Sequence, residues 1–171
     1  MGCGMVRKVD ELGRVVIPKE MRRILNIKSG SSIEMSINNN NQVVLEKFFE
    51  LSNIYSSAEN LASLIFDELS IPCLICDDEK VIICKGLNKK DFLNKKLSDG
   101  FSVKNKTCEV VKDANFLDGN TITGDTYIFT ITSDGFDSGY VVVFDKENKL
   151  TESTKNNIML LTKFLSSFLK F

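Results

Sequence analysis

The N-terminal fold is decided by residues 5–25, which read MVRKVDELGRVVIPKEMRRIL. β-Branched residues stand among long basic ones from Met5 to Val9 and again from Arg14 to Ile17, a composition typical of strands. Residues 10–13, DELG, lie between these runs and predict a turn, in which Gly13 can adopt a positive φ. The stretch therefore predicts a short hairpin.

A short helix is predicted to follow this hairpin, from Pro18 to about Asn26. Proline fixes φ and lacks an amide hydrogen, two properties that suit the first position of a helix. The helical period of about 100° per residue gives this segment two faces. Its cationic face carries Lys19, Arg22 and Arg23. Its apolar face carries Met21, Ile24 and Leu25.

A second hairpin is predicted from residues 32–37 and 42–47, whose runs are separated by four asparagines at positions 38–41. Asparagine tolerates the left-handed conformation, so the asparagine run is typical of a hairpin loop. A unit of about 45 residues encloses too little interior to be stable alone without disulfides or metal. We therefore expect two copies of this unit to interleave their strands in a dimer.

Such a dimer would gather the basic side chains of both copies on one surface, which suits the negative charge of a phosphate backbone. The candidate DNA-binding residues are Arg7, Lys8, Arg14, Lys19, Arg22 and Arg23. Residues 1–30 carry seven Lys or Arg against three Asp or Glu, whereas the remaining residues carry fifteen against twenty. A solvated basic face without a nucleic-acid partner is the simpler alternative, and charge and spacing alone leave both open.

Residues 6–23, VRKVDELGRVVIPKEMRR, resemble the swapped-hairpin DNA-binding domain of the AbrB-like transition-state regulators nearly residue for residue. The resemblance implies an intertwined β-barrel dimer that binds double-stranded promoter DNA, preferably A/T-rich and flexible. Arginines that contact phosphates and read DNA shape would fit such a preference. The residues implied to contact DNA are Arg7, Arg14, Arg22 and Arg23, with Lys8 beside the first.

Antitoxins of the same fold provide a second interpretation, in which the hairpin domain chiefly holds a partner protein. The Arg22-Arg23 pair and the large C-terminal domain favour a transcriptional regulator, since such an antitoxin more often ends in a short disordered tail.

The rest of the chain predicts an α+β domain. The expected order is a helix over about 52–69, strands 71–76 and 80–84, a short helix over 88–96, strands 107–112, 126–132 and 138–144, and a final helix capped by Thr151. This order is typical of an antiparallel sheet flanked by helices, as in GAF-like or PAS-like domains. We expect an AbrB-like domain over 1–48, a linker helix over 49–70 and a GAF-like domain over 71–171.

The second half also resembles sporulation regulators that join an AbrB-like domain to a GAF-like one, in LICD at 74–77 and KKDFLNK at 89–95. This resemblance implies control of sporulation genes and a tetramer held by the helices that flank the GAF-like domain. GAF-like domains often bind a small molecule between the sheet and the helix and loop on its far face. Residues 88–96 and 101–108 would line that place, but the sequence identifies neither an effector nor its ligands.

Several classes of function are not expected. The chain has no histidine, no nucleophile elbow and no phosphate-binding glycine loop, so we expect neither an enzyme nor a cofactor. Cys73 and Cys76 lie three apart on a predicted strand and should face opposite sides, which argues against a zinc site. With no signal peptide and no apolar run of membrane length, we expect a cytoplasmic, nucleoid-associated protein without a membrane partner.

Overall fold

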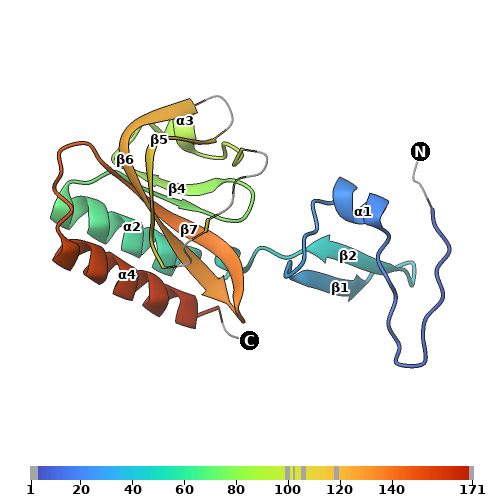
Figure 1. The fold of residues 1–171 in the computed structure, drawn as a ribbon. Helices are drawn as coiled ribbons and strands as arrows, with labels where there is room; N and C mark the ends of the chain where they lie inside the picture. The colour runs from blue at the N-terminus through green and yellow to red at the C-terminus, as the bar shows by residue number, and fades with distance from the viewer. Residues whose placement is uncertain (1–3, 99–100, 102, 105–106, 118–119, 170–171) are drawn as a thin grey trace. The chain divides into compact units, whose positions relative to one another are not determined.

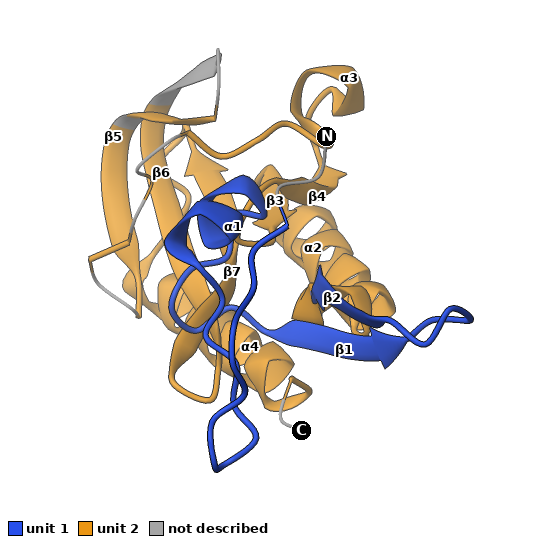
Figure 2. Ribbon diagram, turned by 90° about the vertical axis from the view of Figure 1, so that its right-hand side faces the viewer, with its two compact units in different colours: residues 1–48 blue, residues 49–171 orange. Residues whose placement is uncertain are grey.

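The chain forms two compact units, Met1–Phe48 and Phe49–Phe171, which Figure 2 distinguishes by colour. The computed structural model describes residues 4–98, 101, 103–104, 107–117 and 120–169.

The first unit contains a short helix and a hairpin (Figure 1). Helix α1 spans Lys19–Ile24, strand β1 spans Ile33–Ile37 and strand β2 spans Val43–Lys47. The two strands pair antiparallel, with Ile37 opposite Val43. Asn41 has a φ of 57°, so an asparagine in the left-handed region closes the loop, as the sequence predicts.

The N-terminal hairpin is formed only at its turn. Asp10 N donates to Arg14 O at 3.0 Å and Gly13 N donates to Asp10 O at 3.0 Å, with Gly13 at a φ of 78°. The strands predicted over 5–9 and 14–17 are not found in any sheet that the described residues form, and that prediction is wrong for the single chain. A lone two-stranded hairpin is marginal in water, because few ladder bonds offset the ordering of two strands.

The second unit is built on an antiparallel sheet with the strand order β4-β3-β7-β6-β5 (Figure 1). Its strands are β3 (Cys73–Cys76), β4 (Val81–Lys85), β5 (Glu109–Leu117), β6 (Asn120–Ser133) and β7 (Phe136–Asp145). The last three are longer than the sequence predicts, since β5 and β6 stay paired across register shifts. Strand β7 lies at the centre, between β3 and β6.

Two helices cover one face of this sheet, α2 (Tyr55–Leu69) and α4 (Glu152–Ser167). A 3₁₀ helix, η1 (Glu50–Ser52), leads into α2. Phe129 and Val141 belong to the apolar layer beneath these helices, whereas Ile128 and Val142 belong to a second layer on the other face. Part of that second layer is supplied by residues around the short helix α3 (Lys89–Phe92). The predicted cap of α4 is confirmed, because Thr151 Oγ1 accepts a hydrogen bond from Thr154 N at 3.2 Å.

Cys73 and Cys76 lie on opposite faces of the sheet, one in each apolar layer. This arrangement follows from the two-residue period of a strand. Across the described residues, no group of three or more Cys, Asp or Glu side chains is placed to hold a metal ion. The described helices also include none with the length and apolar character that a membrane span requires.

Candidate nucleic-acid interface

The turn between Asp10 and Arg14 holds one candidate arginine in place. Asp10 Oδ1 accepts hydrogen bonds from Leu12 N at 3.0 Å and Arg14 N at 2.8 Å, while Oδ2 accepts one from Arg14 Nε at 2.7 Å. The bond from the Arg14 backbone, followed by that from its side chain, lowers the pKa of Asp10 from its ordinary value. Because Asp10 engages Nε, both terminal amino groups of the guanidinium can donate to a phosphate.

Helix α1 presents three more candidate cations to solvent. Pro18 precedes the helix, and its carbonyl accepts a hydrogen bond from Arg22 N at 3.0 Å. The side chains on the cationic face are Lys19, Arg22 and Arg23, and all are exposed. The predicted apolar face is uncovered as well, since Ile24 is 74% exposed and α1 has no buried residue.

Arg7 and Lys8 lie on the arm that precedes the turn, and both are exposed. All six candidate residues therefore lie on the surface of the first unit. Arg7 and Lys8 precede the turn and Arg14 follows it. The hydrogen bond from Asp10 N to Arg14 O brings the two segments together at the turn. Among the described residues, Arg14 is the one candidate with an ion-pair partner.

Two residues with structural roles around this surface were not among the predicted site residues. Asp10 positions Arg14. Asp10 stands four residues before Arg14, at the start of a turn that contains Gly13, and this pattern could have identified Asp10 from the sequence. Lys47 Nζ donates to Asn26 O at 3.3 Å, which ties the end of β2 to the chain just beyond α1. Nothing in the local sequence marks this second contact, because the residues are 21 positions apart.

The first unit leaves most of its apolar side chains exposed to solvent, and of its described residues Pro18 alone is buried. The large exposed apolar residues are Met5, Val6, Val9, Leu12, Val15, Val16, Ile24, Leu25, Met35, Ile37, Val43 and Leu45. Two cross-strand pairs, Met35 with Leu45 and Ile37 with Val43, place four of these on one face of the hairpin. An exposed apolar surface of this extent is typical of an interaction site.

Helix α4 and Phe168, the residue that caps its C-terminus, carry exposed apolar side chains. Leu160, Phe164 and Phe168 follow each other at intervals of four and are 66%, 61% and 50% exposed. The rings of Phe164 and Phe168 meet edge to face with centroids 4.9 Å apart. At least half of the surface of each aromatic residue is therefore exposed to solvent.

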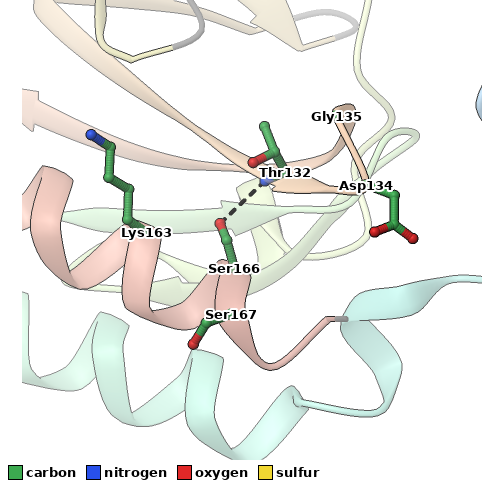
Figure 3. A pocket seen from close by; sticks show the side chains of 6 residues that line it. All are labelled: Thr132, Asp134, Gly135, Lys163, Ser166 and Ser167. Atoms are coloured by element: carbon green, nitrogen blue, oxygen red, sulfur yellow. Dashed lines mark hydrogen bonds between the residues drawn. The ribbon is translucent and has the colours of Figure 1, made fainter. Parts of the chain in front are cut away.

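A cavity of about 450 Å³ lies where the end of α4 meets the β6–β7 turn (Figure 3). It is lined by Thr132, Asp134, Gly135, Lys163, Ser166 and Ser167. Its serines are already engaged, since Ser166 Oγ accepts from Thr132 N at 3.2 Å and Ser167 Oγ donates to Phe164 O at 2.6 Å. Lys163 and Asp134 point away from each other (Figure 3), so the charges do not converge on one ligand.

The predicted effector region, residues 88–96 and 101–108, belongs only in part to the described residues. Within residues 101–108, Ser102, Asn105 and Lys106 lie outside the described residues. Phe101 packs edge to face on Tyr140 with ring centroids 5.1 Å apart, in the second apolar layer. Burial and nearby carboxylates raise the pKa of Tyr140 to about 12, so its hydroxyl is protonated at neutral pH.

Residues 6–47 match the family model described as "Antidote-toxin recognition MazE, bacterial antitoxin". Residues 50–170 match the one described as "Stage V sporulation protein T C-terminal, transcription factor". Stage V sporulation protein T of Bacillus subtilis is 33% identical over 169 residues, which is 95% of each chain.

Two shorter relatives from the same organism match the N-terminal part alone. The transition state regulatory protein AbrB is 49% identical over 45 residues, which cover 26% of this chain and 46% of AbrB. The putative transition state regulator Abh is also 49% identical over 45 residues, which cover 26% of this chain and 48% of Abh.

Proposed function

This chain belongs to the family of the stage V sporulation protein T transcription factors, and from that premise we propose how it engages DNA and assembles. Its N-terminal domain is an AbrB-type DNA-binding domain, and the protein is a transcription factor rather than an enzyme. The residues proposed to contact duplex DNA are Arg7, Lys8, Arg14, Lys19, Arg22 and Arg23. The regulated genes are proposed to be sporulation genes on the nucleoid, which would place the protein in the cytoplasm.

The observation that carries the proposal is the exposure of all six cations on one small unit, with Arg14 oriented by Asp10 at 2.7 Å. Guanidinium groups fit phosphate oxygens in a planar, two-pronged geometry. Phosphate contacts fix a protein on the duplex but carry little sequence information. We therefore expect sequence-tolerant binding with a preference for flexible, A/T-rich promoter DNA.

The first unit is proposed to act as an intertwined dimer. A single chain leaves Val16 76% exposed and Ile37 75% exposed, together with most other apolar residues of the unit. Pairing the two N-terminal arms with those of a second copy would complete their hydrogen-bond ladders and bury these side chains in one barrel. On this proposal the domain boundary falls near Phe48, and residues 49–70 link it to the regulatory domain.

The second unit is proposed to be a GAF-like domain that mediates tetramer formation or senses a small molecule. Two dimers could associate through the exposed side of α4, where Leu160, Phe164 and Phe168 form an apolar stripe. A tetramer would present two DNA-binding dimers, so avidity would raise its affinity for DNA with two suitably spaced sites.

A second candidate function rests on the match of residues 6–47 to an antitoxin family. In this alternative the domain holds a partner protein through the same exposed apolar surface. Binding of that kind would not require release of counterions from DNA, so the two functions differ in their dependence on salt.

A salt titration of duplex binding tests the proposed function. Fluorescence anisotropy of labelled A/T-rich and G/C-rich duplexes of equal length would be measured with the full chain. If six to ten phosphates are contacted, affinity should fall by about 10³ to 10⁵ between about 50 and 200 mM salt. A flat titration, or no binding at the lowest salt, would contradict DNA binding through these cations and favour the antitoxin-like alternative.

A further inference from the structure

A cavity of about 310 Å³ lies within the second unit, bordered by η1, the start of α2 and the β3–β4 turn. Leu51, Ile82 and Leu93 contribute apolar side chains to its lining. Tyr55, Asp77 and Lys80 contribute polar ones. Pockets that bind small molecules are usually apolar with a few convergent polar groups, and about 300 Å³ is the lower end of their size range. The cavity therefore has the size and composition of a site for a small ligand.

Asp77 is the least expected residue of this lining, because it is a charged residue that is only 3% exposed. Its Oδ1 accepts hydrogen bonds from Glu79 N and Lys80 N, both at 2.7 Å. No described residue donates a hydrogen bond to Oδ2. Burial is the main reason that the pKa of Asp77 is raised from its ordinary value of 3.8. Oδ2 is not among the buried side-chain oxygens that lack a hydrogen-bond partner, so it is open to solvent, and a ligand's cation or donor would replace water there.

The turn itself does not require a charge at this position. An asparagine could accept the same two backbone hydrogen bonds through its Oδ1, and asparagine and aspartate both favour such turns. A neutral amide would also avoid the free energy of burying a carboxylate. The charge of Asp77 is therefore better explained by a ligand than by the hairpin.

Lys80 brings a positive charge to the same cavity, three residues after Asp77. No described carboxylate forms an ion pair with it. Asp77 N donates to Lys80 O at 3.0 Å, so the turn fixes the backbone from which both side chains project. The adjoining wall is held by Asn94 N, which donates to Val81 O at 2.9 Å. The cavity thus offers both charge signs from a rigid frame.

The apolar part of the lining consists of one buried residue and two half-buried ones. Leu51 is 1% exposed and belongs to the main apolar layer, while Ile82 and Leu93 are half-buried. A ligand with ends of opposite charge and an aliphatic body would match this combination. A lone cation would leave Lys80 unmatched, and a lone anion would leave Asp77 unmatched.

We propose that this cavity binds a small zwitterion of the α-amino acid class with an apolar side chain. The ammonium group would bind Asp77 Oδ2, the carboxylate would bind Lys80 Nζ, and the side chain would pack on Leu51, Ile82 and Leu93. Charge-assisted hydrogen bonds at both ends would fix the ligand's orientation. This site includes Leu93 and Asn94 of the stretch 88–96, which was expected from the sequence to line an effector site. None of the described residues of 101–108 lines it, and it is separate from the cavity at the end of α4.

The site lies on the chain segment that leads out of the first unit. Strand β2 ends at Lys47, and Phe49, two residues later, already lines the cavity. A ligand that orders residues 49–55 would therefore restrain the segment that joins the DNA-binding domain to the regulatory domain. This last step rests on the function proposed above, whereas ligand binding itself does not.

Isothermal titration calorimetry of the full chain, without DNA, tests the proposal. The probes are L-leucine and L-isoleucine, with 3-methylbutylamine lacking the carboxylate, 4-methylpentanoate lacking the amine, and glycine lacking the side chain. We expect saturable binding of leucine or isoleucine, and binding at least about tenfold weaker for each analogue that lacks a charged group. Titration of each probe to about 10 mM covers the affinities of weak metabolite sites.

Charge-removing variants show which of the two cavities binds the amino acid. Asp77→Asn retains the turn's acceptor and removes the charge, and Lys80→Gln removes the other charge; each should weaken binding at least about tenfold. Asp134→Asn and Lys163→Gln make the same exchanges at the cavity of Figure 3 and should leave affinity unchanged.

Three results would overturn the proposal: no saturable binding of leucine or isoleucine, equal affinity of wild type and Asp77→Asn, or equal affinity for the amino acid and an analogue lacking one charge. The salt titration of DNA binding is carried out without any amino acid or analogue. Failure of the proposed DNA contacts and failure of this site are therefore observed in separate experiments.

Discussion

Gly139 on β7 lies directly against Leu51 of η1: a β-carbon at position 139 would be 2.5 Å from Leu51 Cδ1 and would also collide with Cys76 O. The neighbouring Ser138 donates from Oγ to Glu50 Oε2 at 2.7 Å. Adjacent residues of the central strand therefore hold η1, and with it one wall of the cavity beside Asp77.

Gly139→Ala should destabilise the second unit and weaken the proposed amino-acid binding. The new methyl group would force Leu51 away from strand β7 and so displace a residue that lines the cavity. Overpacking a well-filled interior typically costs about 1–3 kcal/mol. Urea unfolding followed by circular dichroism measures the free-energy change, and calorimetry measures the affinity. Gly4→Ala is the control, since nothing lies within 4 Å of a β-carbon there. Equal stability of wild type and Gly139→Ala would show that η1 is not packed on β7 in this way.

Arg22→Ala combined with Arg23→Ala should weaken binding to many duplex sequences while leaving the assembly folded. Both side chains are exposed, so their truncation removes phosphate contacts rather than packing. The slope of log affinity against log salt should fall in magnitude by about 1 for each phosphate that the variant no longer neutralises. Anisotropy titrations at several salt concentrations measure this slope.

Lys89→Ala combined with Lys90→Ala provides the matched control, because these are likewise two adjacent, exposed basic residues on a short helix, but in the second unit. The control should bind DNA as wild type does. A similar reduction in both double variants would show that net charge, rather than the face of α1, determines affinity.

Met35→Gln tests the intertwined dimer. Met35 is 74% exposed in the single chain, and changes at such surface positions usually alter stability by less than about 0.5 kcal/mol. In an interleaved dimer its side chain is proposed to be buried, so the amide should lower both the unfolding temperature and the stability of the dimer toward dilution. Ser36→Gln, on the opposite face of β1, is the control. Indistinguishable melting of both variants would argue against burial of this face.

The first unit shows most clearly where sequence reasoning reached its limit. The turn around Gly13, the helix after Pro18 and the asparagine-closed hairpin were all predictable, because each depends on local backbone preferences. The arms at 5–9 and 14–17 have strand composition but no ladder in one chain. Composition reports what a segment can form, whereas a strand also requires a neighbour that the local sequence does not specify.

The second unit was predictable in element order because its segments have clear periods, and Cys73 and Cys76 fell on opposite faces as expected. The cavity beside Asp77 was predicted only in part: Leu93 and Asn94 belong to the stretch 88–96 expected to line an effector site, whereas Leu51, Asp77 and Lys80 were not expected there. It joins η1, the β3–β4 turn and the segment after α3, which are far apart in the sequence. The proposed DNA-contacting residues came from resemblance and charge, and their role stays a prediction.

Leu160→Gln combined with Phe164→Gln should convert a tetramer into dimers without unfolding the second unit. These side chains are 66% and 61% exposed, so the domain itself loses little packing when they become polar. Native mass spectrometry and light scattering measure the number of subunits. Lys163→Gln changes a neighbouring exposed residue of α4 and should not alter assembly. A variant that keeps the wild-type mass would exclude this stripe as the contact between dimers.

Asp77→Asn should make the ligand-free protein more stable at neutral pH, with a pH dependence of definite sign. Burial, and to a smaller extent Asp78, raise the pKa of Asp77 from 3.8, while hydrogen bonds from Glu79 N and Lys80 N and the charge of Lys80 oppose the shift. Since the folded-state pKa is the higher one, the protonated carboxyl favours folding below 3.8. That contribution is lost as pH rises through the folded-state pKa.

The stability difference between Asp77→Asn and wild type should therefore be smallest below pH 3.8. It should increase as the pH rises from 3.8 through the higher folded-state pKa, and then stay constant toward pH 7. Urea unfolding of both proteins across this range measures it. Saturating leucine should reduce the difference at pH 7, because only the wild type gains binding free energy from an ammonium–carboxylate contact. A difference that is constant with pH would show that Asp77 is ionised equally well in the folded and unfolded chains, and its burial would then need another explanation.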